Sequence, residues 1–523
     1  MVELSRRMFL ARAGSVAAAT LTAEAIGIAP KFGMKPAAAD AAEARRKKSL
    51  PSFLTNGDEE SYPTKIASYT KGLPHNDRGE VDLPAYSAFL KALATGQHAD
   101  FEAVPLGGRA KFANPQAAYA SAVEGFALHE LALSVPPAFA SAETASEMVE
   151  LYWQALTRDV PFTEYATHPL TTAAAADLSH CSDFRGPKVR KVVPPATLFR
   201  GPTTGDVIGP YLSQFLWLDV EQGTMTLTQR NRVPVAHDDY MRTYPEWLSI
   251  QRGLAPARIN VRDTIPRYLC NGRDLAEYVH RDYPYQAYLN ACLILLAMGA
   301  PLKGDHPYKR SLTQGGFITF GPPDALDCVA RVASPALKAC WYHKWLVHRR
   351  LRPEAFGGRI HNHLTHVAEY PLHEDVLKAQ ALEAVFRVTG SYLLPMAYPE
   401  GCPTHPAYPA GHAAIAGACA TVLKAFFNEA HVIPAPVVVS PDGLSLVPYR
   451  GTALTVGGEL NKLASNIALG RDVAGVHWRS DGIEGLKLGE AVAMKVLARL
   501  RSTYPEHFDG FRFTKFAGTT ITI

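Results

Sequence analysis

Side chains that can bind or transform an anion lie in three separate segments of the chain. In the first, residues 406–414, a proline-rich turn leads into Gly411, His412 and an alanine-rich apolar run, which predicts a loop that enters a buried helix. Gly411 lets the backbone approach a ligand, and His412 would lie at the helix N-terminus, where free N–H groups favour an anion. By itself, such a Gly-His pair is more often a simple turn.

The second segment, residues 341–353, carries two cations and an aromatic ring at helical spacing. It continues residues 336–340 without a break, so the pattern predicts one helix that ends before Pro353. In that helix Lys344 and Arg352 are about two turns apart and Trp341 is one turn before Lys344, so all three would share one side. Periodicity alone would make Trp341 a core residue.

The third segment, residues 470–482, separates two helical patterns and carries Arg471, His477 and Asp481, the last placed to cap the later helix. Three cations that met at one place would be unfavourable unless they held a multiply charged anion. Arginine forks and a lysine point charge match the oxygens of a tetrahedral oxyanion. His477 could then bond the central atom, and His412 could move protons.

Taken together, the motifs Lys-x7-Arg-Pro, Pro-Ala-Gly-His and Arg-x5-His with a following Asp resemble the vanadium-dependent haloperoxidases and the related type 2 phosphatidic acid phosphatases. The eight-residue step from lysine to arginine, and His405 seven residues before His412, are similar to the bromoperoxidases of marine algae and their bacterial relatives. Residues 68–77, 199–202 and 209–215 also resemble that subgroup, so the resemblance spans nearly the whole mature chain.

The resemblance implies an all-α fold of helical bundles with minor β-hairpins, and vanadate as the cofactor. The residues it assigns to vanadate are Lys344, Arg352, Gly411, His412, Arg471 and His477. His477 would form the one bond from the protein to vanadium, His412 would be the acid–base group, and Lys344 would polarise bound peroxide. Trp341 and His405 would lie near the halide, and Asp481 would orient the His477 ring.

The implied activity is oxidation of bromide and iodide, with chloride left open, by hydrogen peroxide to a hypohalite-level oxidant that halogenates an organic acceptor. A homo-oligomer, a dimer or larger, is expected by analogy. An acid phosphatase with His477 as the phosphoryl acceptor is the first alternative, because phosphate and vanadate make similar demands on a pocket. A non-catalytic oxyanion-binding protein is the second.

One position departs from the family pattern, which usually has serine before Gly-His. This chain has Ala410 there and lacks a hydroxyl that could donate to a vanadate oxygen. A hydrogen bond to a charged group contributes about 1.5–3 kcal/mol. The sequence therefore predicts altered vanadate affinity with the site retained.

Bulk composition excludes several classes of protein. The 523 residues are 47% hydrophobic and 20% charged, as in ordinary globular proteins, and the net charge of +4 gives no reason to expect a nucleic acid partner. The seven cysteines show no Cys-x-x-Cys spacing, which argues against a zinc or iron–sulfur framework. The most apolar run, within residues 285–298, is too short to cross a bilayer, so a buried helix is expected rather than an integral membrane protein.

The N-terminus reads as an export signal. Arg6 and Arg7 precede a modest apolar stretch, which predicts a twin-arginine signal peptide over residues 1–39 and a periplasmic or secreted protein. A flexible arm is expected over residues 40–62, followed by helical parts over 63–330 and 331–510 and a tail over 511–523. The expected helices within these parts cover residues 118–133, 145–156, 376–393, 413–427, 460–469 and 483–500, and hairpins are expected within 223–228 and 437–454.

Overall fold

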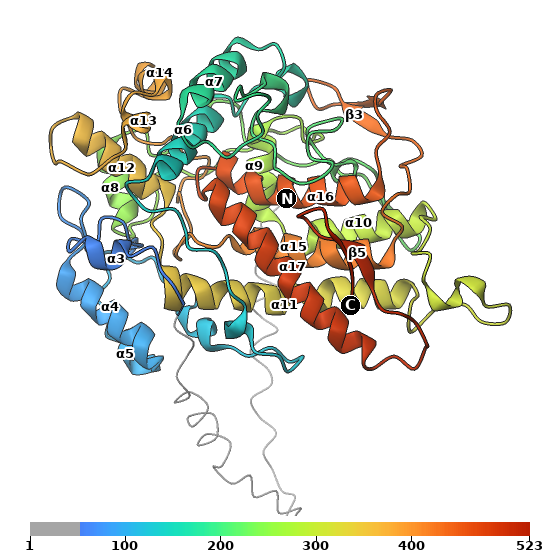
Figure 1. The fold of residues 1–523 in the computed structure, drawn as a ribbon. Coiled ribbons are helices and arrows are strands. Elements are labelled where there is room, and N and C mark those ends of the chain that lie inside the picture. The colour runs from blue at the N-terminus through green and yellow to red at the C-terminus, as the bar shows by residue number, and fades with distance from the viewer. Residues whose placement is uncertain (1–52) are drawn as a thin grey trace, which may run out of the picture. The chain divides into compact units, whose positions relative to one another are not determined.

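The computed structural model describes residues 53–523. The expected signal peptide over residues 1–39 and the first part of the arm over residues 40–62 lie outside the described residues. Helices dominate the regular structure (Figure 1), which confirms the all-α prediction. They are α3 Asp58–Ser61, α4 Leu83–Thr95, α5 His98–Glu102, α6 Ala142–Leu156, α7 Pro169–His180, α8 Tyr244–Gln251, α9 Gly272–Arg281, α10 Gln286–Ala297, α11 Pro322–Tyr342, α12 Pro353–Leu364, α13 Glu374–Leu377, α14 Gln380–Thr389, α15 Gly411–Phe426, α16 Val456–Val473 and α17 Arg479–Arg501.

The strands form three antiparallel hairpins in the described chain: β1 Val220–Gln222 with β2 Met225–Leu227, β3 Val437–Val439 with β4 Leu446–Pro448, and β5 Arg512–Thr514 with β6 Thr520–Thr522. The first two confirm the expected hairpins. None of the helices found between residues 53 and 523 is long and apolar enough to cross a bilayer.

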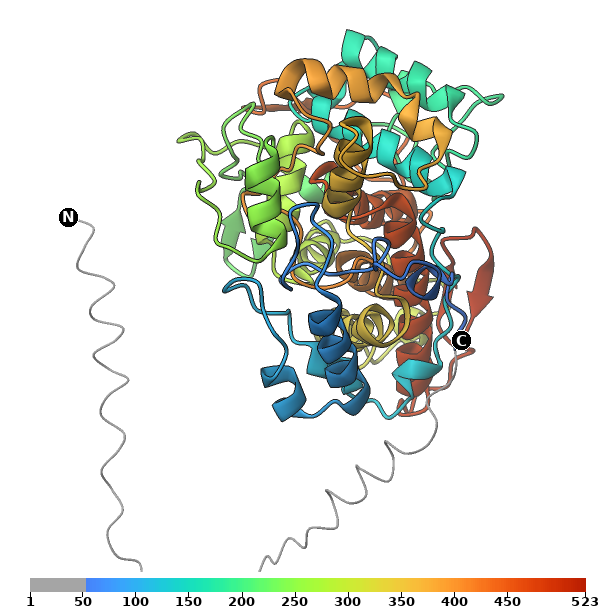
Figure 2. The same cartoon turned by 90° about the vertical axis from the view of Figure 1, so that its left-hand side faces the viewer.

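Helix α15 is the central element of the fold. Its sequence is rich in alanine and glycine, and every one of its residues except His412 is buried. Helices α11, α16 and α17 pack around it, and the perpendicular views of Figures 1 and 2 show them side by side. A Cβ on Gly489 of α17 would lie 1.9 Å from the carbonyl oxygen of Ala414, so only glycine allows α17 to approach α15 this closely.

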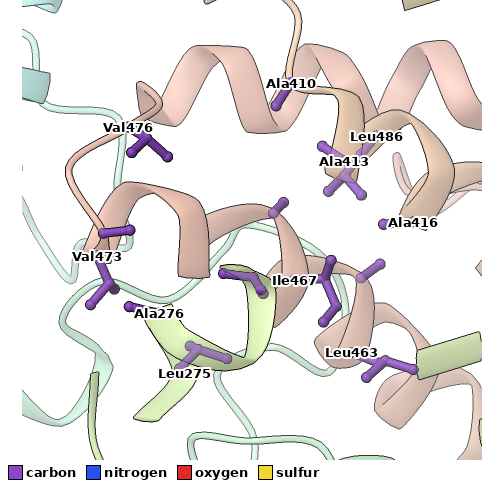
Figure 3. Close-up of a cluster of buried hydrophobic side chains, with 14 of the residues drawn as sticks. Leu275, Ala276, Ala410, Ala413, Ala416, Leu463, Ile467, Val473, Val476 and Leu486 are labelled. Carbon is purple, nitrogen blue, oxygen red and sulfur yellow. The ribbon is translucent and has the colours of Figure 1, made fainter. Parts of the chain in front are cut away.

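Apolar packing fixes the ends of these helices where the candidate residues lie. Figure 3 shows Val473 at the end of α16, Val476 just after it and Ala410 just before α15 in one cluster with Leu275 of α9 and Leu486 of α17. Residues that begin or end at this cluster are therefore held on rigid elements.

The chain leaves the expected helix over residues 336–352 early. α11 ends at Tyr342, a π-helical turn covers His343–His348, and Arg349 is left-handed with φ 39°. The chain then pairs with an N-terminal segment, where the Tyr69 N–H donates to the Arg349 carbonyl oxygen at 2.8 Å. The prediction of a helix up to Pro353 is wrong, because distant backbone groups take the hydrogen bonds that a helix would use.

Two more helix predictions, over residues 118–133 and 376–393, are wrong in whole or in part. Residues 118–133 form loops and 3₁₀ turns, and Gly125 has φ 81°, which does not fit an α-helix. The helix expected over residues 376–393 divides into α13 and α14, because the Asp177 carboxylate accepts two backbone N–H groups at the start of α14. The other expected helices are present, with α16 and α17 longer than predicted.

Both ends of the described chain are tied to the core. Asp58 accepts the Phe139 N–H at 2.9 Å, and Phe513 in the C-terminal hairpin is fully buried, so residues 53–62 and the expected tail are not free segments. The expected boundary at residue 330 falls inside α11, and Phe53–Ile523 form one compact unit. All seven cysteines are buried free thiols.

Candidate active site

Lys344 lies in the π-helical turn after α11 and is fully buried. Its Nζ donates to the carbonyl oxygens of Pro406 and Ala407 at 2.8 and 2.7 Å. Burial, together with the charges of Arg352 and Arg471, lowers the pKa of this ammonium group from 10.5 to about 7. Lys344 therefore links the second segment to the first. Its ammonium group loses its proton more easily than that of an ordinary lysine.

Arg352 joins the second segment to the other two. It is the N-cap residue of α12, and its Nε donates to the His405 carbonyl oxygen at 2.9 Å. One terminal nitrogen donates to the Val476 carbonyl oxygen at 2.5 Å and to His477 Nε2 at 3.1 Å, and the other donates to His405 Nδ1 at 2.9 Å. Its fork thus spans both the loop before α15 and the loop after α16.

Arg471 reaches the site from the last turn of α16. It donates to the Val279 carbonyl oxygen at 2.7 Å, and its guanidinium lies over the Tyr398 ring at 5.6 Å from the centroid. Its Nε is buried and has no hydrogen-bond partner among the described residues. A buried donor without a partner is unfavourable, so this N–H is free for a ligand oxygen.

The three cations converge without compensation. No carboxylate in residues 53–523 forms an ion pair with any of them, whereas the neighbouring buried Arg350 pairs with Glu147 and Asp481. Both site arginines lower the pKa of Lys344, as they must if the three charges lie close together. Buried cations without a counter-charge favour uptake of an anion.

His477 lies in the loop between α16 and α17 and is buried. Its Nδ1 donates to Asp481 Oδ2 at 2.8 Å, while Nε2 accepts the Arg352 N–H. Burial, followed by the charges of Arg352 and Lys344, holds the pKa of the imidazole well below its ordinary value. The ring is therefore neutral, and its unprotonated Nε2 can bond an electron-poor centre.

Asp481 is held from several sides. Its Oδ2 accepts the Trp478 N–H at 3.1 Å, which confirms that it caps α17, and its Oδ1 accepts from Arg350 at 2.8 Å. Arg350 in turn donates to Glu147 at 3.0 Å. Arg350, which belongs to none of the motifs, is thus buried in an ion-pair chain that fixes the orientation of His477.

The N-terminal end of α15 lies beside Asp481, whose carbonyl oxygen accepts the Ala410 N–H at 2.9 Å. Ala414 is the first residue whose N–H bonds within the helix, to the Ala410 carbonyl, so the N–H groups of the preceding turn are free of helical bonds. No side chain caps this end, because the N-cap residue is Ala410. A Cβ on Gly411 would lie 3.4 Å from the Trp341 ring. The uncapped, buried helix end is thus an anion-binding position next to α11.

His412 is the one partly exposed residue of α15, and it contacts a residue that the motifs do not include. Its Nε2 lies 3.0 Å from Oδ1 of Asp282, which follows α9 and is nearly buried. The carboxylate accepts the Nε2 proton, which leaves Nδ1 as the ring atom that can exchange a proton.

Trp341 and His405 form a partly open edge of the site. Their rings lie 4.8 Å apart at 45°, and Trp341 Nε1 donates to the Ala113 carbonyl oxygen at 3.1 Å. Burial, then the charge of Arg352, keeps the pKa of His405 well below its ordinary value, so the ring is neutral. The two rings thus give the cationic site a neutral aromatic border, and Trp341 is more exposed than the core residue that periodicity alone predicts.

Two of the contributing side chains carry no signal in the sequence motifs. Asp282 is 130 positions before its partner His412, and Glu147 is about two hundred positions before Arg350. Helix α9 and the residue that follows it bring the Val279 carbonyl to Arg471 and the Asp282 carboxylate to His412.

Known proteins share this arrangement of sequence and fold. Residues 329–506 match the family described as the VCPO second helical-bundle domain. The chain is 36% identical to the vanadium-dependent bromoperoxidase of Ascophyllum nodosum over 486 residues, which cover 87% of this chain and 86% of that protein. The chain belongs to the vanadium-dependent haloperoxidases.

Two further relatives extend the similarity of this haloperoxidase. It is 35% identical to the vanadium-dependent bromoperoxidase of Corallina pilulifera, over 91% of this chain and 95% of that protein. The homohexameric structure of the second vanadate-dependent bromoperoxidase from Ascophyllum nodosum superposes with a TM-score of 0.86 at 29% identity, over 98% of this chain and 95% of that one. The similarity therefore extends to the part of the chain before residue 329 that supplies Asp282 and Glu147.

Proposed function

We propose that this haloperoxidase binds vanadate and uses hydrogen peroxide to oxidise bromide to a hypohalite-level oxidant, which halogenates organic compounds. The observation that carries this function is the convergence of buried Lys344, Arg352 and Arg471, without a carboxylate partner, on the unprotonated Nε2 of His477. The bromoperoxidases that match most of the chain support the same reaction.

Vanadate fits the residues that are present. Its charged oxygens would compensate the three cations, the free Nε–H of Arg471 and the helix-end N–H of Gly411 would each donate to one oxygen, and His477 Nε2 would bond vanadium. When bound, vanadate supplies an electron-poor centre that activates hydrogen peroxide towards halide without a change in its own oxidation state.

Three side chains of the site, Lys344, His412 and His477, then stabilise charge, transfer protons and hold the anion. A bound anion raises the pKa of Lys344 again, so the lysine is protonated and can polarise an oxygen of the reactant. His412 takes up or delivers a proton at Nδ1 while the Asp282 carboxylate stabilises the charge on its ring. His477 is kept neutral and correctly oriented by Asp481.

The halide approaches along the open edge. The neutral rings of Trp341 and His405 line it. Bromide is large and weakly hydrated, so it loses water beside these rings at a lower cost than a smaller anion would. Iodide, which is more weakly hydrated and more easily oxidised, is expected to react as well, and the chloride range is left to measurement.

The decisive experiment measures bromination of a phenolic dye by the purified protein with peroxide and bromide, before and after vanadate is added. We expect activity only with vanadate, and phosphate should suppress it by competing for the same cations. An absence of bromination together with vanadate-inhibited hydrolysis of an aryl phosphate would instead assign the pocket to phosphoryl transfer, with His477 as acceptor.

Asp282→Asn is expected to separate proton transfer from anion binding. Loss of the carboxylate charge beside His412 should lower the bromination rate about tenfold to a hundredfold. The affinity for phosphate should change by less than about threefold, because the three cations remain. Steady-state dye bromination and calorimetric phosphate titration check this pair of results. A parallel loss in both would contradict the proton-transfer role.

Ala410→Ser is expected to tighten vanadate binding. Ala410 is fully buried at the uncapped end of α15, so a hydroxyl there would add a donor beside the anion. The added hydrogen bond to a charged group should raise vanadate affinity about tenfold to a hundredfold. Vanadate titration of the wild type and the variant measures the change, with Ala416→Ser in the same buried helix as the control. Equal affinities would contradict this role.

The assembly and the cellular location are part of the proposal. The related Ascophyllum structure is homohexameric, which supports a homo-oligomer for this chain. Arg6 and Arg7 and the apolar stretch that follows support twin-arginine export to the periplasm or the outside. Size-exclusion chromatography with light scattering measures the first, and N-terminal sequencing of the mature protein measures the second.

A further inference from the structure

Lys71 lies in the segment over residues 68–77, which the function has not used so far. The lysine is buried, and its Nζ donates to Glu354 Oε1 at 2.8 Å and to the carbonyl oxygens of Glu400 and Cys402 at 2.7 and 2.6 Å. These acceptors belong to the start of α12 and to the loop that leads to His405. One N-terminal side chain therefore ties together two elements of the site.

Glu354 is a buried carboxylate two residues after Arg352, in the first turn of α12. Its Oε1 is bound by Lys71 and its Oε2 accepts the Cys402 N–H at 2.7 Å. Burial and then the charge of Glu354 raise the pKa of the Cys402 thiol, while the charges of Arg352 and Lys71 oppose this. The Cys402 thiol also donates to the Val476 carbonyl oxygen at 3.7 Å, and the same oxygen accepts the Arg352 N–H at 2.5 Å, so Cys402 contacts Glu354 on one side and the acceptor of Arg352 on the other.

A carboxylate at this position could pair with Arg352 and weaken anion binding. A buried carboxylate beside a buried arginine without a counter-charge would normally pair with it and compete with the ligand. Arg352 makes no ion pair with any carboxylate of the described residues, and both oxygens of Glu354 are already occupied. The contacts that occupy them come from Lys71 and from the loop that Lys71 holds.

We infer that Lys71 is a positioning residue that keeps Glu354 from neutralising Arg352 and so preserves the affinity of the site for oxyanions. The inference rests on the proposed function only in taking the three cations as the place where the anion binds. A purely structural clamp would make a different prediction, because removing Glu354 as well would then add to the damage instead of repairing it.

The test measures phosphate binding to the purified, vanadate-free full chain by titration calorimetry at pH 7. In Lys71→Met the freed carboxylate should turn to Arg352, and phosphate should bind about tenfold more weakly. In the double variant Lys71→Met with Glu354→Gln the competing charge is absent, and affinity should return to within about threefold of the wild type. A double variant as weak as Lys71→Met would overturn the inference.

Glu354→Gln in the wild-type background provides a second measurement if Lys71→Met does not fold. Removal of the carboxylate charge should leave phosphate affinity unchanged or tighter, and a tenfold loss would overturn the inference. Lys303→Met, which breaks a comparable ion pair with Glu429 elsewhere in the chain, is the matched control and should leave phosphate affinity unchanged. Dye bromination by the wild type is measured in parallel, so a failure of the proposed reaction is distinguished from a failure of this inference.

Discussion

Lys344→Met is expected to reduce vanadate-dependent bromination about a hundredfold to a thousandfold, the range for loss of one group that stabilises developing charge. The methionine keeps most of the volume of the side chain and removes its charge. Phosphate affinity should fall as well, because one of the three cations is gone. Dye bromination at saturating vanadate and calorimetric phosphate titration check the two effects.

The same variant should change the pH dependence of stability. The pKa of Lys344 is about 7 in the folded protein and 10.5 when the chain is unfolded, so the unfolded state binds more protons between these values. The free energy of unfolding of the anion-free wild type should therefore rise with pH across this window, by about 2–3 kcal/mol between pH 6 and 9. Lys344→Met should lose the part of the rise that Lys344 contributes. Urea unfolding at the two pH values measures the difference.

A matched control exists in Lys424, which is also fully buried. Burial lowers its pKa to about 8, and its Nζ donates to Asn461 and to the Thr514 carbonyl oxygen, away from the site. Lys424→Met should likewise flatten the pH dependence of stability but leave bromination unchanged. Retained bromination in Lys344→Met, or its loss in Lys424→Met, would contradict the role assigned to Lys344.

The convergence of Lys344, Arg352 and Arg471 could be predicted from the sequence, but the way they converge could not. The motifs carry residue types and spacings, which is enough to predict an oxyanion site, and the family resemblance that they carry implies the all-α fold. The single helix expected to align Lys344 with Arg352 is interrupted at Arg349. Pairing with a segment nearly three hundred positions earlier causes the interruption, and no local pattern encodes such a contact.

The carboxylates that pair with His412 and Arg350 could not be predicted from local sequence patterns either. Asp282 and Glu147 are ordinary carboxylates in the sequence, and only the packing of α9 and α6 against the later helices brings them to His412 and Arg350. The helix expected over residues 118–133 from its apolar spacing is also absent, and Gly125 in this stretch has φ 81°, which does not fit an α-helix. Sequence spacing predicted which residues would touch the anion, and the structure adds the side chains that contact and orient them.

The carbonyl-rich loop before α15 explains how the protein tolerates its unpaired cations. Lys344 and Arg352 are held by the carbonyl oxygens of His405, Pro406 and Ala407, which are neutral acceptors. Carbonyl groups satisfy the donors of a cation without cancelling its charge. The site therefore keeps its side chains in place while leaving their net charge available to a ligand.

His477→Ala should separate bonding from charge in the same pocket. We expect a loss of bromination of about a thousandfold or more, because the atom that we propose bonds vanadium is gone. Phosphate affinity should fall by less than about tenfold, since the three cations and the end of α15 remain. Dye bromination and calorimetric phosphate titration provide the two readouts.

Asp481→Asn is the companion variant, because it leaves the His477 ring in place and weakens its orientation. Its bromination should fall between that of the wild type and that of His477→Ala, by about tenfold to a hundredfold. If His477→Ala lost phosphate affinity as severely as activity, the histidine would be acting mainly through the geometry of Arg352, to which it is hydrogen-bonded. If His477→Ala kept both its activity and its phosphate affinity, another residue would have to bond vanadium. His412, at the start of α15, would then be the candidate, because the other motif histidine, His405, already accepts a hydrogen bond from Arg352.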